Sequence, residues 1–186
     1  MPGTANRYRG RFAPSPTGPL HLGSLIAALA SYLDARHNQG LWLLRMEDLD
    51  PPREDAGAAQ AILQSLLDHG LQWDEEVLWQ SQRGDAYDRA LDRLEQTGLL
   101  FRCDCTRAML GAGGACRGRC QPRQAEVSTP HALRIIVPAR TAIEFTDQVQ
   151  GEQQEMLGRE LPDFVLLRKD GLYAYQLAVV VDDATQ

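Results

Sequence analysis

The sequence has no apolar run long enough to cross a membrane. Its longest apolar stretch without a charged side chain covers residues 24–33, whereas a membrane-spanning helix needs roughly 20 residues. A secretory signal needs an apolar segment after its basic residues. No such segment follows the arginines near the N-terminus, which are Arg7, Arg9 and Arg11. We therefore expect a cytoplasmic protein.

The sequence also lacks an excess of basic residues. Its 186 residues include 19 Lys and Arg against 25 Asp and Glu, for a net charge of −6 at pH 7, and its pI is about 5.2. A domain that holds nucleic acid by bulk electrostatics is basic. Any nucleic-acid partner must therefore be bound by a local basic surface.

Glycine and proline are not abundant enough to dominate the composition. There are 16 Gly and 10 Pro, while 44% of the residues are hydrophobic and 24% are charged. These values exclude collagen-like, low-complexity and wholly disordered chains. A length of 186 residues suits one globular domain, or a core with an insertion.

Cysteine is confined to one short segment. The four cysteines are Cys103, Cys105, Cys116 and Cys120. Disulfides are rare in a compartment that keeps thiols reduced, whereas four thiolates joined by a glycine-rich loop suit a tetrahedral structural Zn²⁺ site. The alternative is four free thiols, but the tight clustering favours zinc.

The N-terminal third has the pattern of a strand, a helix and a second strand. Residues 9–13 predict a strand that enters a loop over residues 14–19, whose prolines exclude a helix or a ladder. Helical spacing of apolar residues begins at Leu25, with Ser24 as the expected cap. Residues 41–46 are nearly all apolar, as in a buried parallel strand. Together they predict a βαβ unit and an α/β fold.

Further elements are predicted downstream. An apolar stripe of Ile62, Leu63, Leu66 and Leu67 predicts a second helix, and a third is expected over residues 82–97, before Gly98. Three strands are expected after the cysteine segment, over residues 132–137, 143–146 and 164–168. We find no internal repeat.

The segment His21-Leu22-Gly23-Ser24 follows the proline-rich loop and opens the first predicted helix. Free N–H groups and the helix dipole attract phosphate at such a start. Gly23 permits a close approach of the backbone, and His21 can hydrogen-bond a phosphate oxygen. Taken alone, the segment also fits an ordinary strand-to-helix turn with a surface histidine.

The wider pattern resembles the class I glutamyl-tRNA synthetases. Residues 11–24 read RFAPSPTGPLHLGS, in which HLGS stands where the family has its HIGH motif, and RMEDLD follows one strand later. Within the family, residues 48–54 and 78–83 look most like the small branch of glutamyl-queuosine tRNA(Asp) synthetases. The likeness runs from about Tyr8 to the last residue. It implies the first half of a Rossmann-like class I catalytic core with a zinc-binding insertion.

The resemblance also implies roles for particular residues. The implied pocket for L-glutamate consists of Arg11, Phe12, Ala13, Pro14, Ser15, Glu47 and Tyr175. The implied ATP site consists of Pro14, Thr17, Gly18, His21 and Gly23, and the implied catalytic residues are His21, Gly23 and Ser24. The planar fork of Arg11 suits a carboxylate, and Glu47 is expected to hold the ammonium. Taken singly, a surface Arg–Glu pair and a core tyrosine would be the alternatives.

The implied reaction is adenylation of glutamate by ATP, with Mg²⁺ sharing the charge of the phosphates. The glutamyl group then passes to the cyclopentenediol of queuosine in the anticodon of tRNA(Asp). We expect a monomer with a catalytic core over residues 7–100, a zinc-bearing insertion over 101–162 and a return to the core over 163–186. In this family the third zinc ligand is often Tyr, and here Cys116 takes that place.

Two further features of the family are not found in this sequence. Family members continue through a second half that brings another pocket arginine and a lysine-bearing KMSKS-type loop. We therefore expect a truncated enzyme with little or no ATP activation by these residues alone. Two alternatives stay open: a fragment of a glutamyl-tRNA synthetase that charges the tRNA 3′ end, and a non-catalytic zinc-stabilised module that binds RNA or protein.

Overall fold

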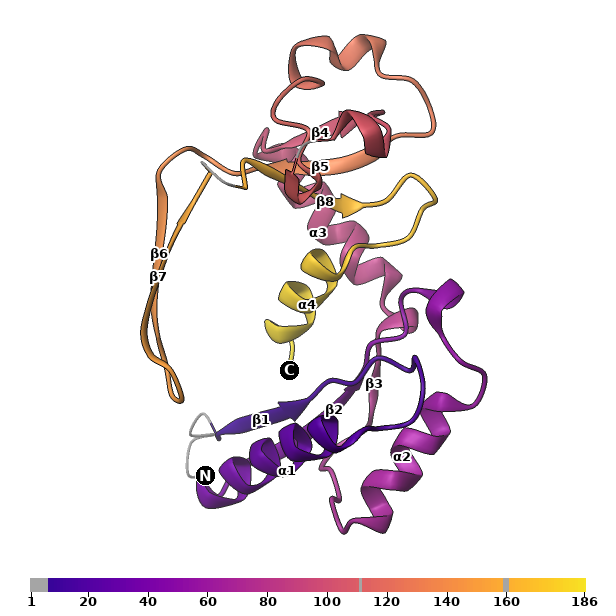
Figure 1. Ribbon diagram of the computed structural model, residues 1–186, viewed down its shortest axis with the longest axis vertical. Coiled ribbons are helices and arrows are strands. Elements are labelled where there is room, and N and C mark those ends of the chain that lie inside the picture. Colours follow the sequence, from indigo (N-terminus) through magenta and orange to yellow (C-terminus); the bar gives the residue numbers. More distant parts are fainter. Residues whose placement is uncertain (1–6, 111, 159–160) are drawn as a thin grey trace, which may run out of the picture. The chain divides into compact units, whose positions relative to one another are not determined.

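The computed structural model describes residues 7–110, 112–158 and 161–186 (Figure 1). The described residues form two compact units, of which the first contains residues 7–84 together with 182–186, and the second contains the described residues between 85 and 181. Compactness alone does not assign a segment to the core or to an insertion, so the expected boundaries at residues 100 and 162 stay a prediction.

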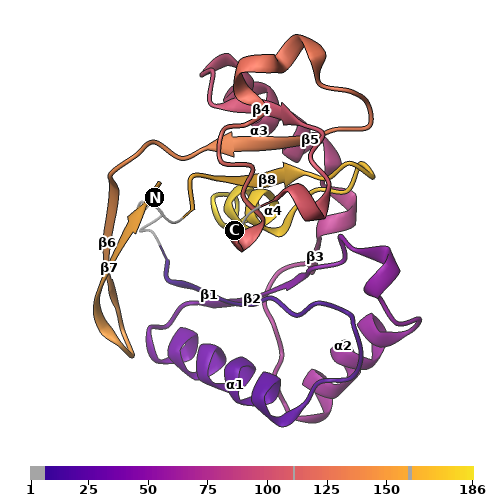
Figure 2. The ribbon, with the colours of Figure 1, turned by 45° about the horizontal axis from the view of Figure 1, so that its top comes forward.

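The first unit is a parallel sheet with two helices, as the βαβ pattern predicts. The strands follow the order β1, β2, β3, with bounds Arg9–Phe12, Leu41–Met46 and Leu78–Trp79. The connecting helices α1 (Leu22–His37) and α2 (Ala58–Asp68) lie on the same face of this sheet (Figure 2). A short 3-10 helix, Pro51–Arg53, follows β2.

Alternation along the strands sorts their side chains onto two faces. The buried cluster on the helix side consists of Phe12, Ala28, Ala35, Trp42, Leu44, Met46, Ile62, Leu66 and Leu71. Arg11, Leu43 and Arg45 occupy the intervening positions of β1 and β2, so they face the other side. The same two strands therefore supply apolar side chains to the core on one face and two arginines, Arg11 and Arg45, on the other.

The α1 helix packs through small side chains. Ala28 and Ala35 are fully buried, whereas Leu29 and Leu33, which belong to the same helically spaced apolar pattern as Ala28, are 46% and 56% exposed. A Cβ atom added to Gly10 of β1 would lie 2.9 Å from the Ala35 Cβ. Because the helix approaches the strand this closely, only small residues fit between them, and the larger leucines turn outward.

The second unit is built on an antiparallel sheet in the order β4, β5, β8, with bounds Leu100–Cys103, Ala132–Ile136 and Asp163–Leu167. A separate hairpin pairs β6 (Thr141–Asp147) with β7 (Gly151–Leu157). The strands predicted over 132–137, 143–146 and 164–168 correspond to β5, β6 and β8. The sequence analysis did not assign β3, β4 or β7.

Two helices join the units. The α3 helix (Gly84–Gln96) leads from the first unit into the second, and α4 (Tyr175–Asp183) returns, since its last two residues belong to the first unit. The cysteine segment contains three short 3-10 helices, Arg107–Met109, Ala112–Gly114 and Gln121–Glu126. Within the described ranges, none of the helices combines the length and the apolar character needed to span a bilayer.

Candidate active site and metal centre

A cavity of about 640 Å³ lies where β1 ends and α1 begins. Its lining includes these residues from the expected sites: Phe12, Ala13, Pro14, Ser15, Thr17, Gly18, His21, Gly23 and Ser24. Ligands of parallel α/β sheets bind outside the carboxyl ends of the strands. The expected ATP-binding loop and helix start therefore share one cavity at the edge where this fold binds ligands.

The imidazole of His21 caps the first helix. Its Nδ1 accepts a hydrogen bond from the Ser24 backbone N–H at 3.2 Å, so α1 begins at Leu22 and the expected cap at Ser24 is wrong. A Cβ on Gly23 would lie 3.1 Å from the His21 ring. A side chain at position 23 would therefore crowd the ring in this orientation. The exposed imidazole and the first N–H groups of α1 lie beside the cavity.

Backbone hydrogen bonds connect the proline-rich loop to the segment after β2. The Pro14 carbonyl accepts the Glu47 N–H at 2.9 Å, and the Pro16 carbonyl accepts the Asp55 N–H at 3.0 Å. Glu47 follows directly after β2. Glu47 thus lies against the loop that lines the cavity.

Four charged side chains form a cluster on the face of the sheet opposite the helices. Arg45 donates from one Nη to the Glu47 Oε1 at 3.1 Å and from the other to the Asp183 Oδ1 at 2.6 Å. The same Asp183 oxygen lies 2.6 Å from an Nη of Arg11. The structure therefore links Arg11 to Glu47 through Arg45 and Asp183, which the sequence analysis did not select.

The environment of this cluster shifts the pKa values of its members. Burial raises the pKa of Glu47, although the hydrogen bond and charge of Arg45 oppose the rise. Burial and the charge of Arg45 lower the pKa of Arg11. Burial also disfavours the charge of Arg45, but its hydrogen bonds to Asp183 and Glu47 outweigh that effect and raise its pKa. The cluster thus holds two arginines beside a carboxylate that is a weaker acid than usual.

Tyr175 is not part of this cluster. It begins α4 in the second unit, and it is 59% exposed. Its expected role in the glutamate pocket stays a prediction.

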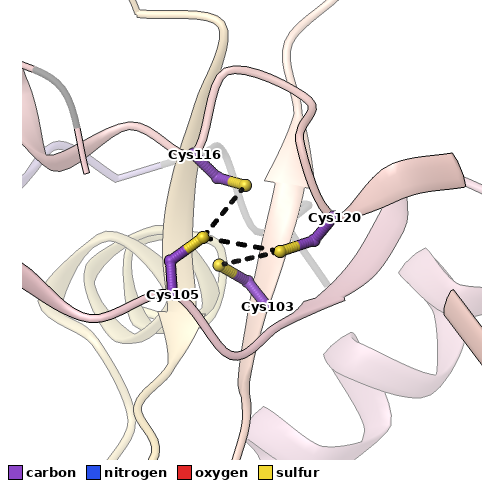
Figure 3. Close-up of side chains that lie close together, drawn as sticks. All are labelled: Cys103, Cys105, Cys116 and Cys120. Atoms are coloured by element: carbon purple, nitrogen blue, oxygen red, sulfur yellow. Dashed lines mark hydrogen bonds between the residues drawn. The ribbon is translucent and has the colours of Figure 1, made fainter. Parts of the chain in front are cut away.

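The four cysteines come together in the second unit (Figure 3). The Sγ atom of Cys105 lies 3.8 Å from that of Cys116 and 3.5 Å from that of Cys120, which is 3.8 Å from that of Cys103. All four are buried, and their ligand atoms lie within 4.8 Å of one another. Sulfurs at the corners of a Zn–S tetrahedron are separated by about 3.7 Å. The donor set therefore fits a structural Zn²⁺ ion.

The surroundings of the thiols fix their backbone. Asp163 is fully buried, and its carboxylate accepts the Cys116 N–H at 2.9 Å and the Arg117 N–H at 2.7 Å. Arg134, 4% exposed, donates its Nε to the same carboxylate at 2.6 Å. This ion pair holds the turn that carries Cys116 against the β5–β8 sheet. Such a contact orients a metal ligand before the metal arrives.

Burial also sets the acidity of the thiols. It raises the pKa of Cys103 and of Cys105 above the usual thiol value. A metal must therefore displace protons from these two side chains, which makes its affinity depend on pH.

Comparison with known proteins identifies the class. Residues 7–186 match the model of the catalytic domain of class I tRNA synthetases (E and Q), so the chain belongs to that family. Among curated relatives, it is 56% identical over 184 residues to the glutamyl-Q tRNA(Asp) synthetase of Pseudomonas putida (strain GB-1). This alignment covers 98% of this chain and 62% of the relative. The chain is 53% identical over 186 residues to the protein of that name from Klebsiella pneumoniae (strain 342). The chain thus spans about three fifths of the length of these relatives.

Solved structures give the same fold. A glutamate tRNA ligase from Elizabethkingia meningosepticum, crystallised with its amino acid, superimposes with a TM-score of 0.82 at 31% identity. The match covers 96% of this chain and 42% of that chain. The predicted Rossmann-like class I fold is therefore confirmed, as is the family that the motifs indicate.

Proposed function

We propose that these residues belong to an enzyme that activates L-glutamate with ATP and transfers the glutamyl group to queuosine in the anticodon of tRNA(Asp). One observation carries the first half of this proposal: the cavity lined by His21 and the start of α1 is also lined by Pro14, whose carbonyl accepts the N–H of Glu47 after β2. Family membership and the names of the relatives support it.

Each side chain has a task in this proposal. The Glu47 carboxylate pairs with the glutamate ammonium, and the Arg11 guanidinium pairs with a glutamate carboxylate. His21 and the N–H groups at the start of α1 bind the ATP phosphates. Mg²⁺ enters with ATP as part of that substrate and shares the phosphate charge.

The chemistry needs positioning and charge stabilisation more than covalent help. A carboxylate oxygen of glutamate forms a bond to the α-phosphorus of ATP. The bond from that phosphorus to the bridging oxygen breaks, and pyrophosphate leaves. The groups described here bind both reactants on either side of the new bond. Zinc has no part in the step and keeps the cysteine segment folded.

Direct binding tests the glutamate site. Equilibrium dialysis of the 186-residue chain should show binding of labelled glutamate that is lost in Glu47→Gln, while Glu76→Gln, at a surface glutamate of the same unit, serves as control. His21→Ala should weaken ATP binding and leave glutamate binding intact. Equal glutamate binding by the Glu47 and Glu76 variants would refute the assignment of the pocket.

Catalysis needs a separate measurement. We expect little or no glutamate-dependent exchange of labelled pyrophosphate into ATP from these 186 residues, and exchange at a rate typical of synthetases would refute that expectation. A chimera that continues after Gln186 with the remaining length of the P. putida relative should glutamylate tRNA(Asp) only when it carries queuosine. Labelling of the tRNA 3′ end instead would favour the alternative acceptor.

A further inference from the structure

Arg45 is a charged side chain in the middle of an apolar strand. It lies in β2, its side chain is 1% exposed, and its neighbours Leu44 and Met46 belong to the core. Burying a guanidinium is costly unless it is paired with opposite charge and hydrogen-bonded. A buried arginine at this position therefore has to be explained by what it binds.

One partner of Arg45, Glu47, belongs to the proposed glutamate site, and the other, Asp183, binds a second member of that site, Arg11. One Nη holds Glu47 at 3.1 Å, and the other holds Asp183 at 2.6 Å, on the oxygen that also binds Arg11. The cluster contains two positive and two negative groups. It is therefore neutral before the amino acid binds, and Asp183 separates two guanidinium groups that would otherwise repel each other.

Exposure separates the side chains that can reach a ligand from the one that cannot. The Arg11 side chain is 25% exposed and that of Glu47 is 10% exposed, against 1% for Arg45. Glu47 accepts the hydrogen bond of Arg45 with Oε1, so its Oε2 can accept one from an ammonium group. Arg45 thus acts on a ligand through its neighbours and does not touch it.

We propose that Arg45 is a positioning residue that holds Glu47 directly, and Arg11 through Asp183, in the orientation that binds glutamate. This inference rests on the proposed function. It assigns to Asp183, at the end of α4, the task of anchoring Arg11 from a point far along the chain. It also explains why a strand that otherwise supplies the core contains an arginine.

The test measures glutamate affinity and the titration of Glu47 in the same variants of the 186-residue chain. Calorimetry gives the glutamate dissociation constant. The carboxyl ¹³C shift of Glu47, assigned with Glu47→Gln, gives its pKa without any ligand. Arg45→Met removes both hydrogen bonds of Arg45, and Arg45→Lys keeps the positive charge but loses the two-pronged guanidinium. Asp183→Asn removes the negative charge that Arg11 and Arg45 share, and leaves the pair of Arg45 with Glu47 in place. Arg36→Met, which breaks the partly exposed pair with Asp74 in the same unit, is the matched control.

We expect Arg45→Met to weaken glutamate binding by about tenfold to a hundredfold, the usual effect of losing a charged hydrogen bond. The pKa of Glu47 should rise in this variant, because Arg45 lowers it in the native cluster. Arg45→Lys should recover part of the affinity, since one ammonium reaches one carboxylate well. Asp183→Asn should weaken binding without raising the pKa of Glu47, and Arg36→Met should change neither quantity.

Three results would overturn the proposal. An unchanged Glu47 titration in Arg45→Met shows that the pair does not form. Unchanged glutamate affinity in Arg45→Lys and Asp183→Asn shows that the orientation does not matter, and these two variants decide the matter if Arg45→Met fails to fold. Tighter binding by Asp183→Asn shows that Asp183 competes with the ligand for Arg11. If the native chain binds no glutamate, the proposed function fails, whereas the Glu47 titration still decides whether Arg45 supports that carboxylate.

Discussion

The two units of the chain are stabilised internally by different kinds of side chain. The buried cluster of the first unit is made of aliphatic and aromatic side chains from two strands and two helices. The corresponding cluster around the metal centre contains Phe101 and four cysteines, and the ion pair of Arg134 with Asp163 is buried beside it. The first unit is therefore ordered by apolar burial and places charged side chains on the sheet face opposite its helices. The cysteine segment is held by polar contacts, and its four thiols could hold a metal ion.

The largest predicted effect is the loss of structure in the cysteine segment, but not in the first unit, when metal is removed. Cys105→Ser, or chelation of the native chain, should abolish bound zinc and unfold the cysteine segment, since a structural zinc ion contributes on the order of 10 kcal/mol to such a fold. Amide hydrogen exchange should show lost protection in residues 103–126 and unchanged protection in β1 and β2. A purified chain without zinc, or with equal protection after its removal, would contradict the prediction.

Asp163→Asn should destabilise the second unit by about 3–5 kcal/mol, because it leaves the buried Arg134 without its counter-charge. It should also weaken metal affinity by roughly 10- to 100-fold, since the turn carrying Cys116 loses its anchor. Chemical denaturation and competition with a metal indicator measure the two effects. Asp170→Asn is the control, because its pair with Arg168 is half exposed and should contribute about 1 kcal/mol or less. Equal effects of both variants would disprove the buried role.

Leu44→Ala should destabilise the first unit by about 2–5 kcal/mol, the usual cost of a cavity in a closed core. Leu44 is fully buried in β2. The zinc content should not change, because Leu44 belongs to the other unit. Leu33→Ala on the exposed side of α1 is the matched control and should alter stability by less than about 0.5 kcal/mol. A zinc loss in Leu44→Ala would show that the two units fold as one.

The smallest predicted effect is a pH dependence of glutamate binding. Burial raises the pKa of Glu47, so its carboxylate takes up a proton at a higher pH than an ordinary glutamate. Because the ammonium binds the ionised form, affinity should fall as the pH drops from 7 towards that pKa. Calorimetry at a series of pH values checks this, and Glu47→Gln should bind weakly at every pH. Affinity that rises on acidification would contradict the assignment.

Local patterns predicted much of the fold. Residues 41–46 were predicted as a strand with its observed bounds, because a nearly continuous apolar run of this length between Gly40 and Glu47 is typical of a buried strand. The sequence GEQQEML of β7 gave no signal, since a hairpin exposed on both faces needs no apolar alternation. The helical spacing of apolar residues did not indicate which of them α1 buries, because its packing is set by the close approach of Gly10 to Ala35.

Some residues of the candidate site could be proposed from the sequence, and others only from the structure. His21 and Glu47 could be proposed from the sequence because each belongs to a family motif, and their roles stay predictions. Arg45 and Asp183 were not selected, because their contact joins residues that are far apart in the sequence. One signal was present: an arginine within an apolar strand, two residues before an acid, on the strand face that Arg11 shares in the neighbouring strand.

The most direct test of the account is binding of a non-hydrolysable glutamyl-adenylate analogue, a glutamyl sulfamoyl adenosine, to the 186-residue chain. This ligand joins the amino acid to the nucleotide and so reports on the cavity and the charged cluster together. We predict saturable binding by calorimetry that is weakened separately by His21→Ala and by Glu47→Gln. Binding that neither substitution changes, or no binding by the native chain, would contradict the claim that one edge of this sheet accepts both reactants.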